Sequence, residues 1–294
     1  MQDGVSTAEG IALVLIVLLI GTRYRGLNNI VHECSHFSFS LSREDNVFFG
    51  RLCSTLILKS FHHYRIEHMS HHAHVGDYEH DEDFKAIQRF RLEEPLTPRT
   101  ILRHALTPFT GMHVPYYCRP NLSGADGAGW RAARIGLVAA AVLLVALAPI
   151  EAAILVWAPY VLAYTAINYW TDCIDHGGLV GQDDELAASR NMVVPKWLRA
   201  IVFPRNDCYH LIHHLFPQVP TRHLDACHER LMGHPAYRDS AEANGALFAA
   251  VEDDALPAAT RLAPAPEPPP RRVPRSRAAG RTGRRRFARY RSAS

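Results

Sequence analysis

Residues 135–150 (IGLVAAAVLLVALAPI) and 152–170 (AAILVWAPYVLAYTAINYW) are long apolar stretches separated only by Glu151. Arg131 and Arg134 precede the first stretch. About 20 apolar residues of helix cross the hydrocarbon core of a bilayer, so two such stretches in tandem predict a transmembrane hairpin. A buried helical pair in a soluble protein is the alternative, because both stretches lie near the lower length limit for spanning.

A third apolar stretch lies near the N-terminus, at residues 11–20 (IALVLIVLLI). Ten helical residues rise only about 15 Å, roughly half of a bilayer core. The helix must therefore extend beyond these ten residues if it is to cross the membrane. We expect a membrane helix near residues 8–31. A signal peptide fits less well, because no basic region precedes the stretch and no small-residue cleavage site follows it. Residues 46–61 and 100–117 mix apolar and charged side chains, which predicts interfacial or cavity-lining segments.

The 294 residues and the 48% apolar content are compatible with one or two ordinary domains. The net charge of +3 hides an asymmetry, since residues 271–294 hold ten Arg and no acidic residue. The Pro-, Ala- and Arg-rich segment 257–294 lacks the apolar residues that would offset ordering entropy, so we expect a disordered, solvated tail. Anionic lipid headgroups could bind it, and no nucleic-acid partner is expected.

The membrane orientation follows from the hairpin and from the positions of the arginines. A hairpin returns the chain to its starting side, and the excess of Arg places that side in the cytosol. Six dispersed Cys without a C-x-x-C pair fit a reduced compartment and exclude a disulfide-dense scaffold. The Ala- and Arg-rich composition favours a bacterial origin. We therefore expect an integral protein of a bacterial cytoplasmic membrane.

Histidine is the most unusual feature of the composition, with 18 residues, most of them bunched. Three clusters stand out: His32-Glu-Cys-Ser-His36, His68-Met-Ser-His71-His72 and His210-Leu-Ile-His213-His214. Helical residues i, i+3 and i+4 share one face, so each cluster is expected to aim its imidazoles at a common point. A random chain of this composition would contain about 0.07 H-x-x-H-H triplets, whereas two occur. Surface histidines without a function are therefore a weak explanation.

The number of clustered histidines limits the choice of metal. Imidazole suits zinc, copper, iron and nickel, but eight clustered imidazoles exceed the ligands of one tetrahedral zinc, so two metal ions are predicted. A pair of irons with four or five nitrogen ligands each would keep positions open for dioxygen. His176, just beyond the second hairpin stretch, is a ninth candidate. Asp172 and Asp175 could orient an imidazole or hold a metal-bound water.

The clusters resemble the histidine boxes of the membrane-bound fatty acid desaturase superfamily, which includes hydroxylases and carotenoid ketolases. The first box is similar to His32-x-x-x-His36 and the second to Tyr64-Arg65-x-x-His68-x-x-His71-His72. The third is similar to Asn206-x-x-Tyr209-His210-x-x-His213-His214-Leu-Phe-Pro217-x-Val-Pro220. Order, spacing and the intervening hairpin agree over about residues 11–235. The motifs are specific for the superfamily but not for a substrate.

The resemblance implies an all-α membrane protein whose transmembrane helical stem carries a cytosolic helical cap with a histidine-rich di-iron site. Residues 1–256 would form this domain, with transmembrane helices near 8–31, 134–150 and 152–170. The implied iron ligands are His32, His36, His68, His71, His72, His176, His210, His213 and His214. Asp172, Asp175 and Asn206 would support them. The sequence departs from the superfamily in having less membrane helix before the first box and in carrying Asp172 where some members have a neutral side chain.

The implied activity is that of an O2-dependent oxidoreductase, and we favour a fatty acyl desaturase. Hydroxylation or ketolation of a lipid or specialised metabolite is the alternative within the superfamily. An apolar tunnel, lined by residues 46–61, 100–117 and the hairpin, would position the substrate. The sequence contains no haem-binding segment or Cys-rich iron–sulfur motif, so a separate ferredoxin or cytochrome with its reductase is expected to supply two electrons.

Two other classes of protein, a zinc protease and a metal-storage protein, would use the same histidines. Residues 32–36 match H-E-x-x-H, in which Glu33 would be the general base of an intramembrane zinc protease, but this leaves the other boxes unused. A membrane protein that only stores metal would use all the clusters without turnover.

We expect no catalytic or metal-binding role for the remaining histidines or for one acidic stretch. We expect His62 and His63 on the cap surface, and we expect His74, His80, His223, His228 and His234 to be structural or solvated. The acidic stretch Asp77–Asp83 is read as a solvated loop, and a cation site or a docking surface for a basic electron donor is the alternative.

Overall fold

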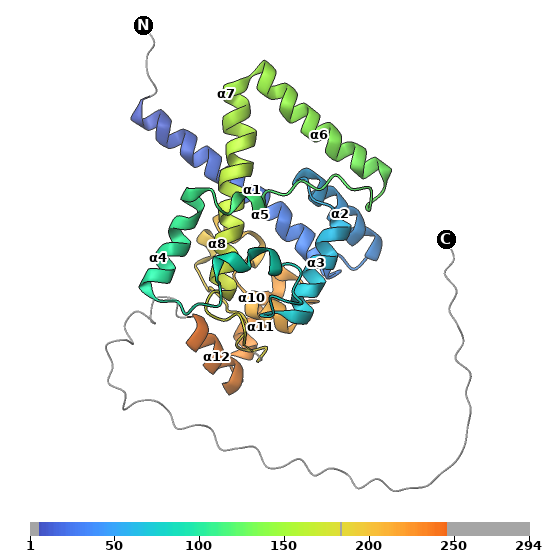
Figure 1. The fold of residues 1–294 in the computed structure, drawn as a ribbon. Helices are drawn as coiled ribbons and strands as arrows, with labels where there is room; N and C mark the ends of the chain where they lie inside the picture. Colours follow the sequence, from blue (N-terminus) through green and yellow to red (C-terminus); the bar gives the residue numbers. More distant parts are fainter. Residues whose placement is uncertain (1–5, 183, 246–294) are drawn as a thin grey trace, which may run out of the picture. The chain divides into compact units, whose positions relative to one another are not determined.

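The computed structural model describes residues 6–182 and 184–245, and these residues form helices joined by loops, with no strand among them (Figure 1). The helices are α1 (Thr7–Ser35), α2 (Arg43–Leu56), α3 (Phe61–His74), η1 (Lys85–Phe90), α4 (Pro98–Leu106), η2 (Thr107–Thr110), α5 (Val114–Tyr117), α6 (Ala128–Leu147), α7 (Pro149–Ala152), η3 (Ala153–Tyr164), α8 (Thr165–His176), α9 (Lys196–Ile201), η4 (Pro204–Asn206), α10 (His210–Leu215), η5 (Thr221–His223), α11 (Leu224–Leu231) and α12 (Pro235–Gly245). The all-α prediction is confirmed. The expected disorder of residues 257–294 concerns residues outside the described part.

Helix α1 has two halves of different character. Ser6 and Glu9 form a capping box at its start, and the helix then runs for 29 residues, or about 44 Å. Ile11, Val14 and Leu15 in its first half are exposed apolar side chains. Its second half is buried and polar, and it ends with the first histidine box. The helix therefore continues past residue 20, as predicted, and places His32 in its last turn and His36 at its C-cap.

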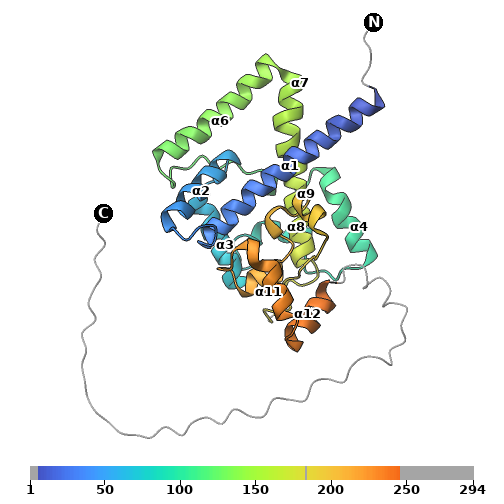
Figure 2. The same ribbon diagram turned by 180° about the vertical axis from the view of Figure 1, so that it is seen from behind.

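The predicted hairpin is formed by α6 and by the continuous helix α7–η3–α8 (Figures 1 and 2). With α1, these are three helices long and apolar enough to cross a membrane. Val142, Leu143 and Leu147 on α6 are more than half exposed, which is the pattern expected where lipid covers a helix. The second arm extends past residue 170 to His176, so it carries a histidine at its C-terminal end.

The contact between α1 and η3 is close because a glycine faces it. A Cβ on Gly21 would lie 2.5 Å from the Cβ of Ala163, so a larger residue would push the two helices apart. Pro159 lies inside η3, a stretch with π-helical hydrogen bonding. Proline removes a backbone donor and clashes with the preceding turn, which accounts for the widened helix at this point. The close contact fixes α8 against the half of α1 that carries the first histidine box.

The smaller helices hold the histidine helices against this frame. Helix α2 packs between α1 and α6, and α4 and α5 pack on α8. Neither α2 nor α4 is a membrane-length helix, which agrees with the interfacial reading of residues 46–61 and 100–117. Helix α10 lies in a core formed by residues such as Phe203, Leu211, Ile212 and Leu224.

A buried ion pair joins the start of α6 to the start of α3. The Asp126 carboxylate accepts hydrogen bonds from the backbone N–H groups of Phe61 (3.2 Å) and His62 (2.9 Å). Arg134 donates to the same carboxylate at 2.9 Å and to the Ser123 carbonyl at 2.7 Å. Both charged side chains are at most 1% exposed. The N-terminus of α3, which carries the second histidine box, is thereby tied to the transmembrane hairpin.

Candidate metal centre

Nine buried or half-buried histidines converge in two adjoining groups. The five-histidine set comprises His32, His36, His68, His72 and His213, and the four-histidine set comprises His71, His176, His210 and His214. Within each set, one ring nitrogen from every residue lies within 4.8 Å of all the others. The rings of His72 and His214, one from each set, stack at 4.4 Å between centroids. These are the nine histidines singled out from the sequence.

The second and third boxes each divide between the two sets, so the expectation that each box aims at one point is wrong. On α3, His68 and His72 join the five-histidine set and His71 joins the other. On α10, His213 joins the five-histidine set and His210 and His214 join the other. Positions i+3 and i+4 flank position i on opposite sides of the helix axis, at about −60° and +40° for 100° per residue. A helix wedged between two sites therefore supplies both.

The spacing of the nitrogens fits ligands around a cation. The Nε2 atoms of His32 and His213 lie 2.6 Å apart, those of His36 and His68 2.8 Å, and those of His176 and His210 2.8 Å. Two nitrogens each about 2.1 Å from one ion and about 90° apart would be about 3.0 Å from each other. Two ring nitrogens this close share either a proton or a metal ion, and the convergence of four or five nitrogens in each set favours the ion. The donor set therefore suits two metal ions, one in each set.

Acceptors on the far ring nitrogens orient several of these imidazoles. The Nδ1 of His71 lies 2.7 Å from the buried Asp81 carboxylate, and the Nδ1 of His176 lies 3.0 Å from the Ala188 carbonyl. A carbonyl or carboxylate can only accept, so Nδ1 carries the proton and Nε2 keeps its lone pair for a metal. The Nδ1 of His210 lies 3.5 Å from the Asp175 carboxylate, which is close enough for electrostatic attraction but makes no hydrogen bond.

Replacing Asp81 by Asn should weaken metal binding in the four-histidine set by about 10-fold to 100-fold. The amide has one oxygen in place of two, so it cannot accept both from His71 and from the backbone N–H groups of Asp83 and Phe84, and it lacks the charge that raises the basicity of the ring. Metal titration followed by mass spectrometry of bound metal would measure the change. Asp77→Asn is the matched control, because Asp77 makes the same kind of contact with His80 (2.6 Å) on the exposed surface. Equal effects of the two substitutions would contradict the role of Asp81.

Burial keeps most of the ligand histidines neutral. Burial, with nearby Arg65 and His71, lowers the pKa of His36 to about 3. Burial, with His36, His71 and His176, lowers the pKa of His72 to about 2. Burial and neighbouring imidazoles also lower the pKa of His68, His210, His213 and His214. His71 is the opposite case, since burial would lower its pKa but Asp81 raises it. Neutral imidazole is the form that binds metal.

These shifts predict that the metal-free protein loses stability as the pH falls. Histidines with lowered pKa values bind protons in the unfolded chain below about pH 6.5 but stay neutral in the folded one, so the unfolded state is favoured there. For His36 the loss runs from about pH 6.5 down to about pH 3, at up to about 1.4 kcal/mol per pH unit. Thermal melts of chelator-treated protein from pH 8 to about pH 5 would measure it. A Tm that rises on acidification would contradict this reading. The raised pKa of His71 acts in the opposite direction and reduces the loss.

The three supporting residues proposed from the sequence lie in different places. Asp175 contacts His210 as described above. The carboxylate of Asp172 accepts a hydrogen bond from the Tyr117 hydroxyl at 2.7 Å and lines the cavity beside the histidines. Asn206 lies away from both sets, where its amide donates to the Thr221 carbonyl at 3.0 Å. Asn206 therefore holds the loop before α10 and has no direct contact with a ligand histidine.

Sequence reasoning missed three charged residues around the site. Asp81 is completely buried, although the acidic stretch around it was read as a solvated loop. Arg25 on α1 forms a buried ion pair with Asp207 and donates to Asn168 at 2.6 Å, which links α1, α8 and the segment before α10. Asp207 carried a weak signal, because it lies three residues before His210, whereas Asp81 lies nine residues after His72.

The other histidines keep structural roles or lie on the surface. His228 contacts the Tyr237 hydroxyl at 2.8 Å, and His80 pairs with Asp77. His62 and His223 are exposed, whereas His63 lines the cavity described next, so it is not simply a surface residue. Glu33, the candidate protease base, is buried and ion-paired with Arg205.

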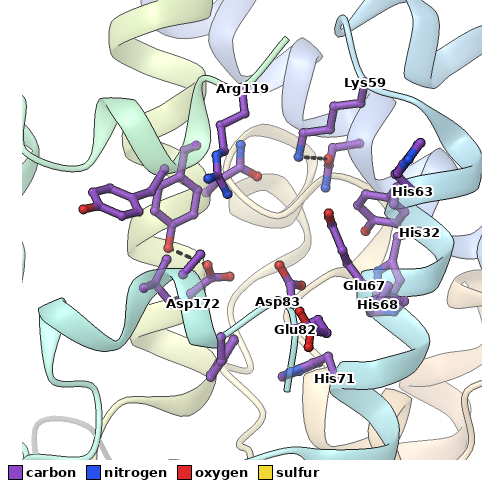
Figure 3. A pocket seen from close by; sticks show the side chains of 18 of the residues that line it. His32, Lys59, His63, Glu67, His68, His71, Glu82, Asp83, Arg119 and Asp172 are labelled. Atoms are coloured by element: carbon purple, nitrogen blue, oxygen red, sulfur yellow. Dashed lines mark hydrogen bonds between the residues drawn. The ribbon is translucent and has the colours of Figure 1, made fainter. Parts of the chain in front are cut away.

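A cavity of about 570 Å³ opens beside the histidines and includes His32, His68, His71, His176 and His210 in its wall (Figure 3). The segments expected to line a substrate tunnel contribute Lys59, Ser60, Tyr116, Tyr117 and Asn168. The wall of this cavity is nevertheless polar and charged, so the expectation of an apolar tunnel is wrong for it. Its volume is within the usual range of ligand pockets.

Comparison with known proteins gives one family match and several relatives. The fatty acid desaturase family model matches residues 9–242. An omega-3 fatty acid desaturase of Glycine max chloroplasts is 28% identical over 240 residues, which cover 69% of this chain and 51% of that protein. Dihydrorhizobitoxine desaturase of Bradyrhizobium elkanii is 27% identical over 255 residues, which cover 80% and 72%.

A third relative is the temperature-sensitive sn-2 acyl-lipid omega-3 desaturase (ferredoxin) of Arabidopsis thaliana chloroplasts, 27% identical over 233 residues. That alignment covers 69% of this chain and 53% of the Arabidopsis protein. The chain thus spans about half the length of these plant relatives, and a larger share of the bacterial one.

Proposed function

Since the family match covers most of the chain, the protein belongs to the fatty acid desaturase family, and we propose that it is a membrane di-iron desaturase. The proposed reaction converts a CH2–CH2 unit to CH=CH with one O2, two electrons and two protons, and it releases two waters. An acyl chain or a related alkyl substrate would be oxidised, and His32, His36, His68, His71, His72, His176, His210, His213 and His214 would hold two irons.

The observation that carries this proposal is the pair of converging imidazole sets beside a cavity that reaches them. Bound there, the irons would supply the oxidation of an unactivated C–H bond by dioxygen. The neutral imidazoles keep the site cationic, Asp81 fixes the ring of His71, and Asp175 lies near that of His210. The cavity holds the reacting carbons next to the histidines, so positioning sets which bond is oxidised.

A separate electron donor is part of the proposal. Two relatives are named for such donors, one for ferredoxin and one for cytochrome b5. We expect a ferredoxin or cytochrome with its reductase to act on this protein from the cytosolic side, to which the arginines around the hairpin assign the histidine site. On this reading the protein is integral to a bacterial cytoplasmic membrane.

The alternatives differ in what they predict for the product and for Glu33. Hydroxylation would add one oxygen atom to the substrate, whereas desaturation removes two hydrogens. A zinc protease would need Glu33 beside a metal-bound water, and its pairing with Arg205 supports the oxidase instead. A storage protein would bind metal without consuming oxygen.

Oxygen consumption by the iron-loaded protein tests the proposal. Purified protein in detergent or nanodiscs, supplied with a reduced ferredoxin or cytochrome, should consume O2 in the presence of substrate and should stop when the donor is withdrawn. Bound iron should stay unchanged on withdrawal. Mass spectrometry of lipids and metabolites from cells with and without the gene would distinguish desaturated from hydroxylated products. Turnover without any donor, or one bound zinc per chain in place of iron, would contradict the proposal.

A further inference from the structure

The cavity beside the histidines carries charges of both signs that do not pair with each other. Lys59 and Arg119 lie along one side of it, and Asp83 and Glu82 lie across from them near His71 (Figure 3). Glu67 and Asp172 also line it. Among residues 6–182 and 184–245, no ion pair joins Lys59 or Arg119 to a carboxylate, and none joins Glu67, Asp83 or Asp172 to a Lys or Arg. The space between these groups is therefore suited to a ligand with both charges.

The basic side is built to receive an anion. Lys59 Nζ lies 3.4 Å from the Asn28 amide oxygen, a neutral contact that leaves its charge uncompensated. Arg119 precedes Pro120 in the loop between α5 and α6, and its guanidinium points into the cavity (Figure 3). A guanidinium binds a carboxylate or a phosphate with two parallel hydrogen bonds.

The acidic side lies nearer the histidines. Glu67 directly precedes His68 on α3, and Asp83 follows Asp81 by two residues. Asp175, also in the wall, is 2% exposed, and its Oδ1 has no hydrogen-bond partner in the described part of the chain. Carboxylates that lack partners in a cavity favour a cation, and an ammonium group can donate to several of them.

Two bound metal ions would explain the carboxylates of the cavity wall but not its basic side chains. Nine neutral imidazoles leave the charge of two divalent ions uncompensated, so nearby carboxylates would be stabilising. The same ions would repel Lys59 and Arg119. Lys59 is half-buried and Arg119 is exposed, and neither pairs with a carboxylate in the described part of the chain, so both are available to bind an anionic group of a ligand.

A plain hydrocarbon chain is a poor occupant of this cavity. Methylene groups packed against these charged side chains would displace their water without replacing its hydrogen bonds, and an unpaired charge is costly to desolvate. A substrate that carries its own charges would replace those hydrogen bonds.

We propose that the substrate is amphoteric, with a carboxylate or phosphate bound by Lys59 and Arg119, an ammonium bound by Glu67 and Asp83, and the alkyl segment to be oxidised next to the histidines. The inference rests on the proposed function and specifies its substrate class. The same chemistry occurs in a free amino acid derivative and in a phosphatidylethanolamine headgroup, so the experiment must separate these two sources.

Calorimetric titration of the iron-loaded protein provides the test. The probes are straight-chain 2-amino acids of increasing length, the carboxylic acids and primary amines of matching length, and lipid nanodiscs of phosphatidylethanolamine or phosphatidylglycerol. An amino acid should bind at least 10-fold more tightly than its matching acid or amine. Preference for phosphatidylethanolamine over phosphatidylglycerol, with no binding of amino acids, would assign the amphoteric group to a lipid.

Two variants separate the two charges. Arg119→Gln should weaken binding of the amino acid and of the acid by about 10-fold to 100-fold, whereas Glu67→Gln should weaken binding of the amino acid and of the amine but not of the acid. Arg99→Gln is the control, because Arg99 is exposed and lies outside the cavity wall. Iron content and Tm, measured in parallel, identify a variant that has lost its metal or its fold.

The proposal is overturned if no amino acid or phosphatidylethanolamine binds better than its singly charged counterpart, or if the variants leave that preference intact. This outcome differs from failure of the proposed function, which would show as missing iron or missing donor-dependent O2 consumption. The titrations need no turnover, so the two results are read independently.

Discussion

His213→Ala should abolish turnover and remove one of the two irons. Its Nε2 lies 2.6 Å from that of His32 and 3.0 Å from that of His72, so it contacts two other members of the five-histidine set. Loss of a group that merely orients a ligand costs about 10-fold to 100-fold in metal affinity or activity, and loss of a ligand itself should cost at least 100-fold. Metal analysis of purified protein should give about one iron per chain in place of about two.

Two matched variants define what the result means. His214→Ala acts on the four-histidine set and should remove the other ion, while His223→Ala changes an exposed histidine outside both sets and should leave iron content and turnover unchanged. If the His213→Ala variant keeps both irons, His213 is not an iron ligand. If the unsubstituted protein and the variant both hold one zinc per chain, the protein would instead be a candidate zinc protease.

The positions of the nine histidines in the sequence predicted that they converge, because helical spacing sets which side chains share a face. Spacing could not predict that His71 turns toward a different site from His68 and His72. That division depends on where α3 lies relative to α10 and α8, which is set by packing between helices far apart in the sequence. The hairpin was predictable for a similar reason, since apolar length is a local property.

The burial of Asp81 and the charged wall of the cavity could not be predicted from the sequence. In the sequence, Asp81 is one acid in an acidic stretch, and such a stretch is usually solvated. It becomes buried because the loop after α3 folds back so that Asp81 reaches His71, and its Oδ1 accepts the backbone N–H groups of Asp83 and Phe84, both at 3.0 Å. The charged cavity wall similarly combines α3, the loop before α6 and α8. No local pattern brings these segments together.

Asp126→Ala should destabilise the protein by about 3–5 kcal/mol, because it leaves the buried Arg134 without a counter-charge. The substitution also removes the acceptor of the first N–H groups of α3. Denaturant titration of the protein in detergent micelles would measure the loss. Asp239→Ala is the matched control, because Asp239 pairs with Arg238 at 3.2 Å on the exposed surface, where such pairs contribute about 0–1 kcal/mol.

The double substitution Asp126→Ala with Arg134→Met separates charge from packing. Removing both charges should recover much of the stability, since replacing a buried ion pair by apolar groups is often neutral. Recovery of stability without recovery of bound iron would mean that Asp126 positions α3 through its backbone contacts. Helix α3 carries His68, His71 and His72, which serve both histidine sets, so a displaced N-terminus of α3 would loosen both metal ions together. Equal stability of Asp126→Ala and Asp239→Ala would show instead that the ion pair does not anchor the metal centre to the transmembrane hairpin.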